Sequence, residues 1–185
     1  MNAKIKAIEY FYPVPVLSNE DLSLEFPDHD FVRFEKDVGI KTRYLADNNT
    51  SALDLAIGAC NLLLQKHDKK DIDFVLYCTQ SPEYVLPSTA CVLQDQLGLS
   101  ISTGALDINL GCSGYTYCLS VAKGLIESNA AKNVLVVTSD TYSKYIDPKN
   151  RINRSLFGDA ATATLIVQSL SNDIAGFLHG TDGSK

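Results

Sequence analysis

One cysteine of this chain stands where a nucleophile could be displayed. Cys112 falls between an apolar strand-like run and an apolar helix-like run, with Gly111 and Gly114 close to it on either side. Glycines permit a sharp strand-to-helix turn, which would push one side chain out at the carboxyl end of the strand. The amino end of a helix adds unpaired N–H groups and a positive dipole end, and both favour a reactive thiolate. The backbone N–H of Cys112 could also donate to an oxyanion, although the same pattern fits a small cysteine packed in the core.

The other four of the five cysteines fit core positions. They each sit inside an apolar helix or strand pattern, where an unpaired cysteine behaves as a small apolar side chain: Cys60, Cys78, Cys91 and Cys118. No two cysteines have Cys-x-x-Cys spacing and no histidine clusters with them, so we expect no metal site. An odd cysteine count without an apolar leader at the amino end indicates a reducing, cytoplasmic compartment.

The composition is that of an ordinary globular protein. The chain has 185 residues, of which 45% are hydrophobic and 21% are charged, and this length suits one domain or one and a half. A formal net charge of -6 argues against a surface that binds nucleic acid or anionic membranes. No apolar run approaches the length needed to cross a bilayer, so we expect no membrane partner.

Strand and helix patterns alternate along the chain, which predicts an α/β layered domain. Apolar or alternating runs predict strands over 4–10, 74–78, 105–109, 134–139 and 160–167, and a further strand starting in 174–178.

Helices are expected in three places between these strands. One begins at Ser51, where Asp54 gives a capping-box start, and another runs from Ser88, as its N-cap residue, to Gly98. The third, over 113–128, has apolar residues on several sides, so we expect it to be largely buried. Outside these elements, we expect loop and short helix over 13–30 and a polar loop over 142–154.

The run around Cys112 resembles a known active-site segment. Residues 107–115 (Asp-Ile-Asn-Leu-Gly-Cys-Ser-Gly-Tyr) are similar to the segment that carries the nucleophile of β-ketoacyl-acyl-carrier-protein synthase III, a family of thiolase-fold condensing enzymes. Other segments resemble that family in the same order: 39–43, 87–90, 136–140, Asp147-Pro148 with Arg151, and 157–161. The resemblance extends from about Ile5 to the end of the chain.

The resemblance implies a fold and a division of the chain. The family's thiolase-like layered fold has two similar halves, each a mixed five-stranded sheet with helices, and a central buried helix follows the nucleophile. Residues 1–170 would form the amino-terminal half, and 171–185 would start the connection to a carboxy-terminal half that is missing here. The resemblance also implies a homodimer.

The resemblance further implies an acyltransferase of fatty acid biosynthesis that makes carbon–carbon bonds. Cys112 would accept an acyl group from acyl-coenzyme A, and malonyl-acyl carrier protein would lose carbon dioxide and attack that thioester. Both thioesters are substrates, and no resident cofactor is implied. The family's histidine and asparagine, which stabilise the carbanion, lie in its carboxy-terminal half, and we carry neither role onto His29, His67 or His179. We therefore expect that this chain alone does not complete the condensation.

Three more positions take roles through the resemblance. Arg151 matches an arginine that lies near the adenine of coenzyme A, and Leu86 matches a residue that reaches across the dimer and limits the acyl pocket. The chain has no Trp, and Arg33 stands where the family often has a tryptophan that faces that arginine, which leaves a carrier-protein acyl donor open. Leu86 in place of a bulkier aromatic residue indicates a pocket that accepts more than acetyl.

Two alternatives stay open at this point. The first is another thiolase-fold enzyme, either a condensing enzyme of secondary metabolism or hydroxymethylglutaryl-coenzyme A synthase. The latter needs a glutamate acid near the cysteine, for which Glu83 is the candidate, although a solvated loop carboxylate fits Glu83 better. The second alternative is a non-catalytic partner subunit, and the intact Cys112 argues against it.

Overall fold

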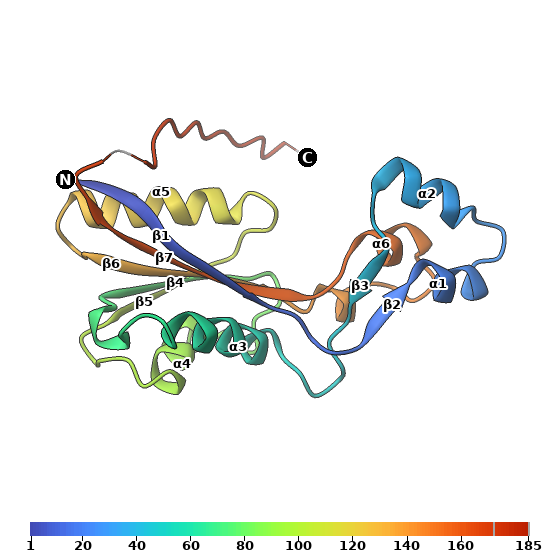
Figure 1. The fold of residues 1–185 in the computed structure, drawn as a ribbon, viewed down its shortest axis with the longest axis horizontal. Helices are drawn as coiled ribbons and strands as arrows, with labels where there is room; N and C mark the ends of the chain where they lie inside the picture. The colour runs from blue at the N-terminus through green and yellow to red at the C-terminus, as the bar shows by residue number, and fades with distance from the viewer. Residues whose placement is uncertain (172, 185) are drawn as a thin grey trace.

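The chain folds around one mixed five-stranded sheet (Figure 1). The structure, a computed structural model, describes residues 1–171 and 173–184. The strands lie in the order β1-β7-β6-β4-β5, with bounds β1 Asn2–Phe11, β4 Phe74–Cys78, β5 Gly104–Ile108, β6 Asn133–Asp140 and β7 Ala160–Ser169. β4 runs parallel to β5 and β6, whereas β7 is antiparallel to β6 and β1 is antiparallel to β7. Because three strands are parallel, their carboxyl ends meet at one end of the sheet, which is where α/β proteins place their sites.

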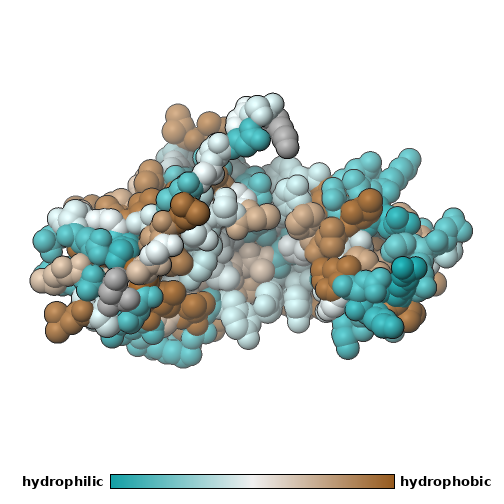
Figure 2. All heavy atoms as spheres, turned by 90° about the horizontal axis from the view of Figure 1, so that it is seen from above, coloured by the Kyte–Doolittle hydropathy of each residue, from teal (hydrophilic) through white to brown (hydrophobic). Residues whose placement is uncertain are grey.

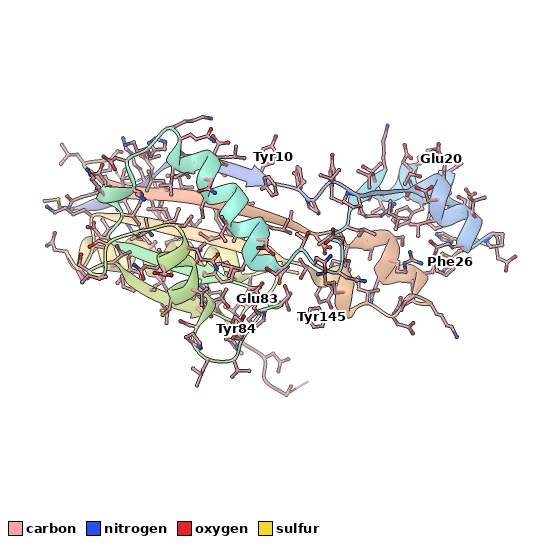
Figure 3. The ribbon with its side chains drawn as sticks, turned by 90° about the horizontal axis from the view of Figure 1, so that it is seen from below. Tyr10, Glu20, Phe26, Glu83, Tyr84 and Tyr145 are labelled. Carbon is pink, nitrogen blue, oxygen red and sulfur yellow. The ribbon has the colours of Figure 1, made fainter. Side chains whose placement is uncertain are left out.

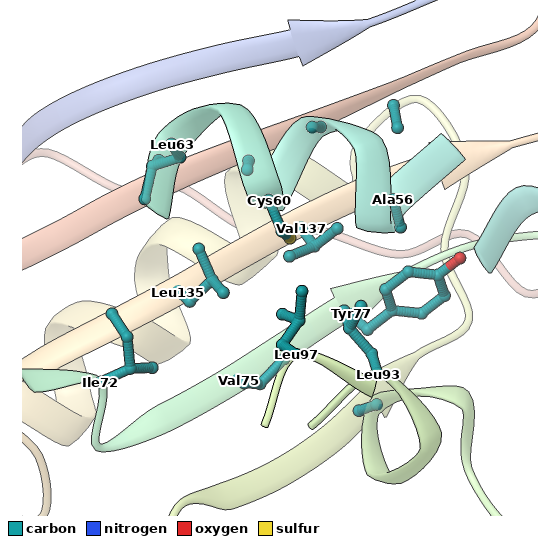
Figure 4. Close-up of a cluster of buried hydrophobic side chains, with 14 of the residues drawn as sticks. Ala56, Cys60, Leu63, Ile72, Val75, Tyr77, Leu93, Leu97, Leu135 and Val137 are labelled. Atoms are coloured by element: carbon teal, nitrogen blue, oxygen red, sulfur yellow. The ribbon is translucent and has the colours of Figure 1, made fainter. Parts of the chain in front are cut away.

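Helices cover both faces of this sheet. α3 (Ala52–Leu64) and α4 (Thr89–Gln96) lie on one face, and α5 (Gly114–Glu127) lies on the other (Figure 1). β4 and β6 are therefore buried on both sides, which explains their unbroken apolar runs. Figure 4 shows the cluster on the α3 face, where side chains from both helices pack against those of β4 and β6.

A small lobe projects from one end of the sheet (Figure 1). It contains β2 Val16–Ser18, α1 Asn19–Glu25, α2 Phe31–Val38, β3 Thr42–Tyr44 and α6 Arg151–Leu156. The buried guanidinium of Arg43 joins these elements, since it donates to the Ser155 carbonyl at 2.8 Å and to Asn19 Oδ1 at 2.6 Å. The same guanidinium lies 5.5 Å from the centre of the Phe34 ring. One buried cation thus holds four segments that are distant in sequence. Two short 3-10 turns, η1 (Lys69–Asp71) and η2 (Tyr142–Tyr145), complete the described elements.

The main expectations for the fold are confirmed. The α/β class, the mixed five-stranded sheet and all five strands that the apolar runs predict are present. The predicted capping box begins α3: the Ser51 hydroxyl accepts from the Asp54 N–H at 3.1 Å, and the Asp54 carboxylate accepts from the Ser51 N–H at 2.8 Å. The short helix expected within 13–30 is α1, which opens with a second capping box at Ser18 and Asp21.

Two local expectations are wrong. The polar segment 142–154 is not a loop, because it forms η2 and the start of α6, whose N-cap Asn150 accepts from the Asn153 N–H at 3.1 Å. No strand forms over 174–178, because β1 already occupies the place beside β7 at the edge of the sheet. Ile174 is buried instead in the apolar cluster between the sheet and α5.

The helix after the cysteine is buried along one side, not largely buried as expected. Its buried residues are spaced by four and form one stripe toward the sheet: Gly114, Cys118, Ala122 and Ile126. The sheet covers only that side; on the other, Tyr117 meets the His179 ring at 4.5 Å between centroids. Figure 2 looks onto this face, where hydrophobic side chains form scattered groups among hydrophilic ones. No helix in the described part of the chain has the length and apolar character needed to cross a membrane.

α4 is capped by a residue distant in sequence. Ser88 is the N-cap residue, as expected, but its hydroxyl lies 3.1 Å from Cys91 Sγ and makes no capping bond. The carboxylate of Asp107, on β5, instead accepts from the N–H groups of Thr89 and Ala90, each at 2.7 Å. A carboxylate at this end of a helix satisfies unpaired N–H groups and also meets the positive end of the helix dipole.

We predict that Asp107→Ala lowers the free energy of unfolding by about 1–2 kcal/mol, because two helix N–H groups lose their acceptor. Urea unfolding monitored by circular dichroism measures this change. Asp95→Ala, which removes an exposed carboxylate near the other end of the same helix, is the matched control and should change stability little. Equal effects of the two substitutions would contradict the capping role.

Candidate active site

Cys112 is exposed in the turn between β5 and α5. The Gly114 N–H donates to the Gly111 carbonyl at 2.8 Å, which closes the turn around the cysteine, and α5 begins at Gly114. The side chain therefore stands at the carboxyl end of a parallel strand and at the amino end of a helix. Of the two interpretations that the sequence left open for this residue, the buried core cysteine does not occur.

Cys112 lines a cavity of about 460 Å³ at the carboxyl ends of β4, β5 and β6. The lining residues come from the turn itself, from the ends of β4 and β6, and from the segment before β7: Cys78, Gln80, Leu110, Gly111, Cys112, Tyr115, Thr138, Asp140, Tyr142, Phe157 and Gly158. The predicted nucleophile thus shares a cavity with side chains that are 30 or more residues away in the chain.

The first turn of α5 packs tightly against the carboxyl end of β4. A Cβ added at Gly114 would overlap Cys78 Sγ and would lie 3.3 Å from the Leu110 Cβ. Cys78 Sγ donates to the Leu110 carbonyl at 3.2 Å, which joins the end of β4 to the turn. Only a residue without a Cβ allows this approach, so packing against β4 requires a glycine at position 114.

Asp140, the last residue of β6, holds the segment that follows β4. Its Oδ1 accepts from the Gln80 N–H at 2.7 Å, from the Ser81 hydroxyl at 2.8 Å and from the Thr79 hydroxyl at 3.1 Å. The Ser81 hydroxyl in turn accepts from the Thr141 N–H at 3.0 Å. One carboxylate therefore fixes the loop that forms one wall of the cavity.

Three of the other four cysteines are buried and one is exposed, whereas we expected all four to be buried. Cys60, Cys78 and Cys118 are buried as predicted, but Cys91 is exposed, so its assignment to the core is wrong. The buried positions of α4 are Thr89, Ala90 and Leu93, which leaves residue 91 on the outward side of the helix. Among the described residues, no group of three or more His, Cys, Asp or Glu side chains could hold a metal ion.

Arg151 and Arg33 line two separate hollows of the small lobe. Arg151 begins α6 and borders a cavity of about 420 Å³ together with Phe26, His29 and Lys149. Arg33 lies on α2 in a neighbouring hollow with His29 and Phe34, and its side chain, 79% exposed, pairs with Asp37 at 3.3 Å. The structure therefore does not place the two arginines face to face, and their roles remain predictions.

Leu86 and Glu83 lie on the loop between β4 and α4, outside the lining of the cavity around Cys112. Leu86 is 83% exposed. Glu83 is not a solvated carboxylate: its Oε1 accepts from the Leu53 N–H at 2.8 Å in the first turn of α3, and its Oε2 is buried. Figure 3 labels Glu83 near one end of α3. Burial and the nearby Glu83 carboxylate raise the pKa of Tyr77. Glu83 is thus a helix-capping group, and nothing in its position supports an acid beside Cys112.

None of the three histidines lines the cavity around Cys112. His29 lies beside Phe31 in the small lobe, and His179 Nε2 lies 3.2 Å from the Ser120 hydroxyl on α5. None of the three therefore contributes an imidazole to the described cavity around Cys112.

Sequence reasoning missed Gln80 as a wall residue of the cavity and Asp140 as the group that holds it. The available signal was position, because Gln80 lies two residues beyond the predicted strand 74–78 and Asp140 directly follows the predicted strand 134–139, where polar side chains gather at the edge of a sheet. Their convergence on Cys112 required the strand order, which the sequence does not show.

The fold and the site together define a class. A mixed sheet layered between helices, with an exposed cysteine at the head of the helix that packs on it, is the arrangement of a thiolase-like fold.

Comparisons with known proteins specify the family. A family model for 3-oxoacyl-[acyl-carrier-protein (ACP)] synthase III matches residues 106–183, which include Cys112. The β-ketoacyl-[acyl-carrier-protein] synthase III of Campylobacter fetus is 39% identical over 186 residues, covering 99% of this chain and 56% of that protein. The chain belongs to the 3-oxoacyl-[acyl-carrier-protein] synthase III family.

Solved structures agree with this assignment. A crystal structure of a 3-oxoacyl-(acyl-carrier-protein) synthase III has a TM-score of 0.94 and 43% identity, with 99% of this chain and 56% of that one covered. A 3-oxoacyl-(acyl-carrier protein) synthase from Burkholderia xenovorans has a TM-score of 0.87 and 39% identity, with 93% and 50% covered. The chain thus spans about half the length of the relatives it matches.

We predict that iodoacetamide modifies the folded protein at Cys112 and Cys91 before the other three cysteines, because these two are exposed. Burial raises the pKa of Cys60 to about 12, and the hydrogen bond with Cys78, together with burial, raises the pKa of Cys118. Neither buried thiol therefore supplies much thiolate at neutral pH. Peptide mass spectrometry after brief labelling measures the order, and early modification of Cys60 or Cys118 would contradict the fold.

We predict that Gly114→Ala destabilises the protein by roughly 1–3 kcal/mol, since the new Cβ overlaps Cys78 Sγ. The double variant Gly114→Ala with Cys78→Ala should recover much of that loss, which a double-mutant cycle in urea quantifies. Gly124→Ala is the control on the same helix: nothing lies within 4 Å of its new Cβ, so helix propensity should stabilise the protein by about 0.5–1 kcal/mol. Absence of recovery in the double variant would exclude Cys78 as the cause.

Proposed function

We propose that this chain carries the acyl-accepting half of a 3-oxoacyl-[acyl-carrier-protein] synthase III-type acyltransferase, in which Cys112 becomes acylated. The observation that carries the proposal is the exposure of Cys112, at the head of α5, inside a cavity formed by the ends of three parallel strands. The family to which the chain belongs supports this role, and so do the names of its relatives. The pathway that this activity would serve is fatty acid biosynthesis.

The first half-reaction is an acyl transfer to sulfur. The Cys112 thiolate attacks the carbonyl carbon of an acyl thioester, a new C–S bond forms, and the donor thiol leaves and takes up a proton. The backbone N–H of Cys112 has no acceptor within the described part of the chain, so it is free to donate to the oxyanion of the tetrahedral intermediate. The position at the amino end of α5 adds the favourable end of the helix dipole.

The second half-reaction needs groups that this cavity lacks. Malonyl-acyl carrier protein would lose carbon dioxide, and the resulting carbanion would attack the acyl-Cys112 thioester. In the cavity as it is described, no histidine side chain faces Cys112, so these residues hold the acyl group but offer no imidazole to stabilise the carbanion. We therefore assign acylation to residues 1–185 and the complete condensation to a protein that also contains the remaining part of its relatives.

Acyl-coenzyme A is the acyl donor that the small lobe favours. Arg151 and Lys149 border one cavity of about 420 Å³, and these two cations suit the phosphates of coenzyme A. The same cavity also contains Asp28 and Glu25, and Glu25 is paired with Arg154. Phe26 offers an aromatic face in the same cavity, in a chain without Trp. Arg33, beside His29, would lie at the rim of this donor site.

The full-length enzyme is proposed to be a cytoplasmic homodimer. The loop between β4 and α4 exposes a run of large apolar side chains, in which Tyr84, Val85 and Leu86 are 57%, 94% and 83% exposed. Such a run suits an interface, and Leu86 would reach from it toward the acyl pocket of the second copy. All five cysteines are free, which suits a reducing compartment.

We predict that residues 1–185, incubated with acetyl-coenzyme A, gain the mass of one acetyl group on the peptide that contains Cys112. Cys112→Ala should abolish the adduct, whereas Cys91→Ala, which removes the other exposed thiol outside the cavity, should retain it. Intact-protein and peptide mass spectrometry measure both results. Acetylation spread equally over Cys91 and Cys112 would overturn the proposed nucleophile.

We also predict that added malonyl-acyl carrier protein yields no 3-oxoacyl product from acylated residues 1–185, whereas the full-length protein yields it. The reason is that the described cavity contains no histidine. Release of radiolabelled carbon dioxide from the malonyl carboxylate measures the step. Turnover by residues 1–185 would show that another side chain of the cavity stabilises the carbanion.

A further inference from the structure

Gln80 is the residue of the cavity wall whose backbone is fixed while its side chain stays free. It follows Thr79 beyond the end of β4, and its N–H donates to Asp140 Oδ1 at 2.7 Å. The residue is exposed, and it lines the same cavity as Cys112. No partner in residues 1–171 or 173–184 forms a hydrogen bond with its carboxamide, so both the donor and the acceptor of that group are available.

The carboxamide of Gln80 lies flat on the residue before the nucleophile. A Cβ built at Gly111 would lie 2.8 Å from Gln80 Oε1 and 2.9 Å from both Cδ and Nε2. Because the three distances are nearly equal, the face of the amide lies over Gly111, and its polar edges are not turned toward that residue. Gln80 and Cys112 line the same cavity, so a group attached to Cys112 shares that space with the amide.

The other polar side chains of the cavity are mostly occupied. The Thr138 hydroxyl lies 2.7 Å from that of Thr162, and the Tyr115 hydroxyl lies 3.4 Å from that of Thr164. Asp140 accepts three hydrogen bonds through one oxygen. The Tyr142 hydroxyl is also without a partner among the described residues, but its ring packs edge-on against Phe157, at 5.1 Å between centroids.

We propose that Gln80 determines acyl specificity, by donating to and accepting from a hydroxyl group on the acyl chain carried by Cys112. The inference rests on the proposed function and names the substrate class of that site: an acyl group with a neutral oxygen substituent close to its thioester. An unsubstituted acyl chain would cover the amide edges without satisfying them, which is unfavourable. An acyl chain with a carboxylate would bring a negative charge beside Asp140, in the same cavity, and would be repelled.

The test compares butyryl, 3-hydroxybutyryl and succinyl thioesters of N-acetylcysteamine on the full-length protein. This small thiol avoids any contribution from the lobe that would hold coenzyme A. In each case the Cys112 thiolate displaces N-acetylcysteamine, and the rate of acyl-Cys112 formation is followed by mass spectrometry. We expect the hydroxylated acyl group to react fastest and the succinyl group slowest.

Gln80→Met keeps the length of the side chain and removes both polar atoms. It should lower the ratio of the 3-hydroxybutyryl rate to the butyryl rate by about fivefold for each hydrogen bond that is lost. Gln96→Met, at an exposed position of α4 outside the cavity, is the matched control and should leave the ratio where it was. Tyr142→Phe tests the hydroxyl of Tyr142, the other unpaired polar group of the cavity among the described residues, and should also leave the ratio in place.

The outcomes separate the two proposals. A ratio near one in the unaltered protein, or a ratio that Gln80→Met does not change, overturns the inference about Gln80 alone. A fall in the ratio with Tyr142→Phe but not with Gln80→Met assigns the hydroxyl contact to the tyrosine and also overturns it. If none of the thioesters forms acyl-Cys112, the proposed function fails, and the inference fails with it.

Discussion

The close approach of α5 to the end of β4 is the contact on which the rest of the site depends. Gly114 lies against Cys78 Sγ without room for a Cβ. The buried side of α5 that begins at Gly114 continues through Cys118 and Ala122 and ends at Ile126. The small side chains in the first turns of α5 allow the helix axis to lie close to the sheet. Because the helix begins so close to β4, the turn before it has no space on the sheet side, and Cys112 is turned outward into the cavity.

Aspartates at or near the ends of strands hold loops at both ends of the sheet. Asp107 caps α4, Asp140 fixes the segment after β4, and Asp73 accepts from the N–H groups of Lys132 and Asn133 at 2.7 and 2.9 Å. Asp159, which is buried, accepts from the Ala46 N–H at 2.7 Å and from the Ser143 hydroxyl at 2.6 Å. Hydrogen bonds to a charged acceptor are about twice as strong as neutral ones, so a few carboxylates can order several loops. Part of the acidic character of the chain is therefore structural.

Two parts of the molecule form two different cavities. The Cys112 thiol, the backbone N–H that we propose as the oxyanion donor and the wall formed by Gln80 all come from segments that the central sheet positions. The small lobe, which Arg43 holds together, contributes a separate cavity with both basic and acidic side chains. In the function that we propose, an acyl donor bound by the lobe delivers its thioester to Cys112, and the second half-reaction uses groups from beyond the described cavity.

The sequence by itself determined the features that depend on neighbours along the chain. The strand runs, the capping box of Ser51 and Asp54, and the glycine-flanked turn at Cys112 could all be predicted, because their interactions span only a few residues. The family motifs then gave the fold class. Only the tertiary structure decided that Asp107 caps α4, that Gln80 covers Gly111, that Cys91 faces outward and that 174–178 finds no place in the sheet. These features depend on which strands are neighbours and which face of a helix is covered, and local patterns of apolar and polar residues contain no such information.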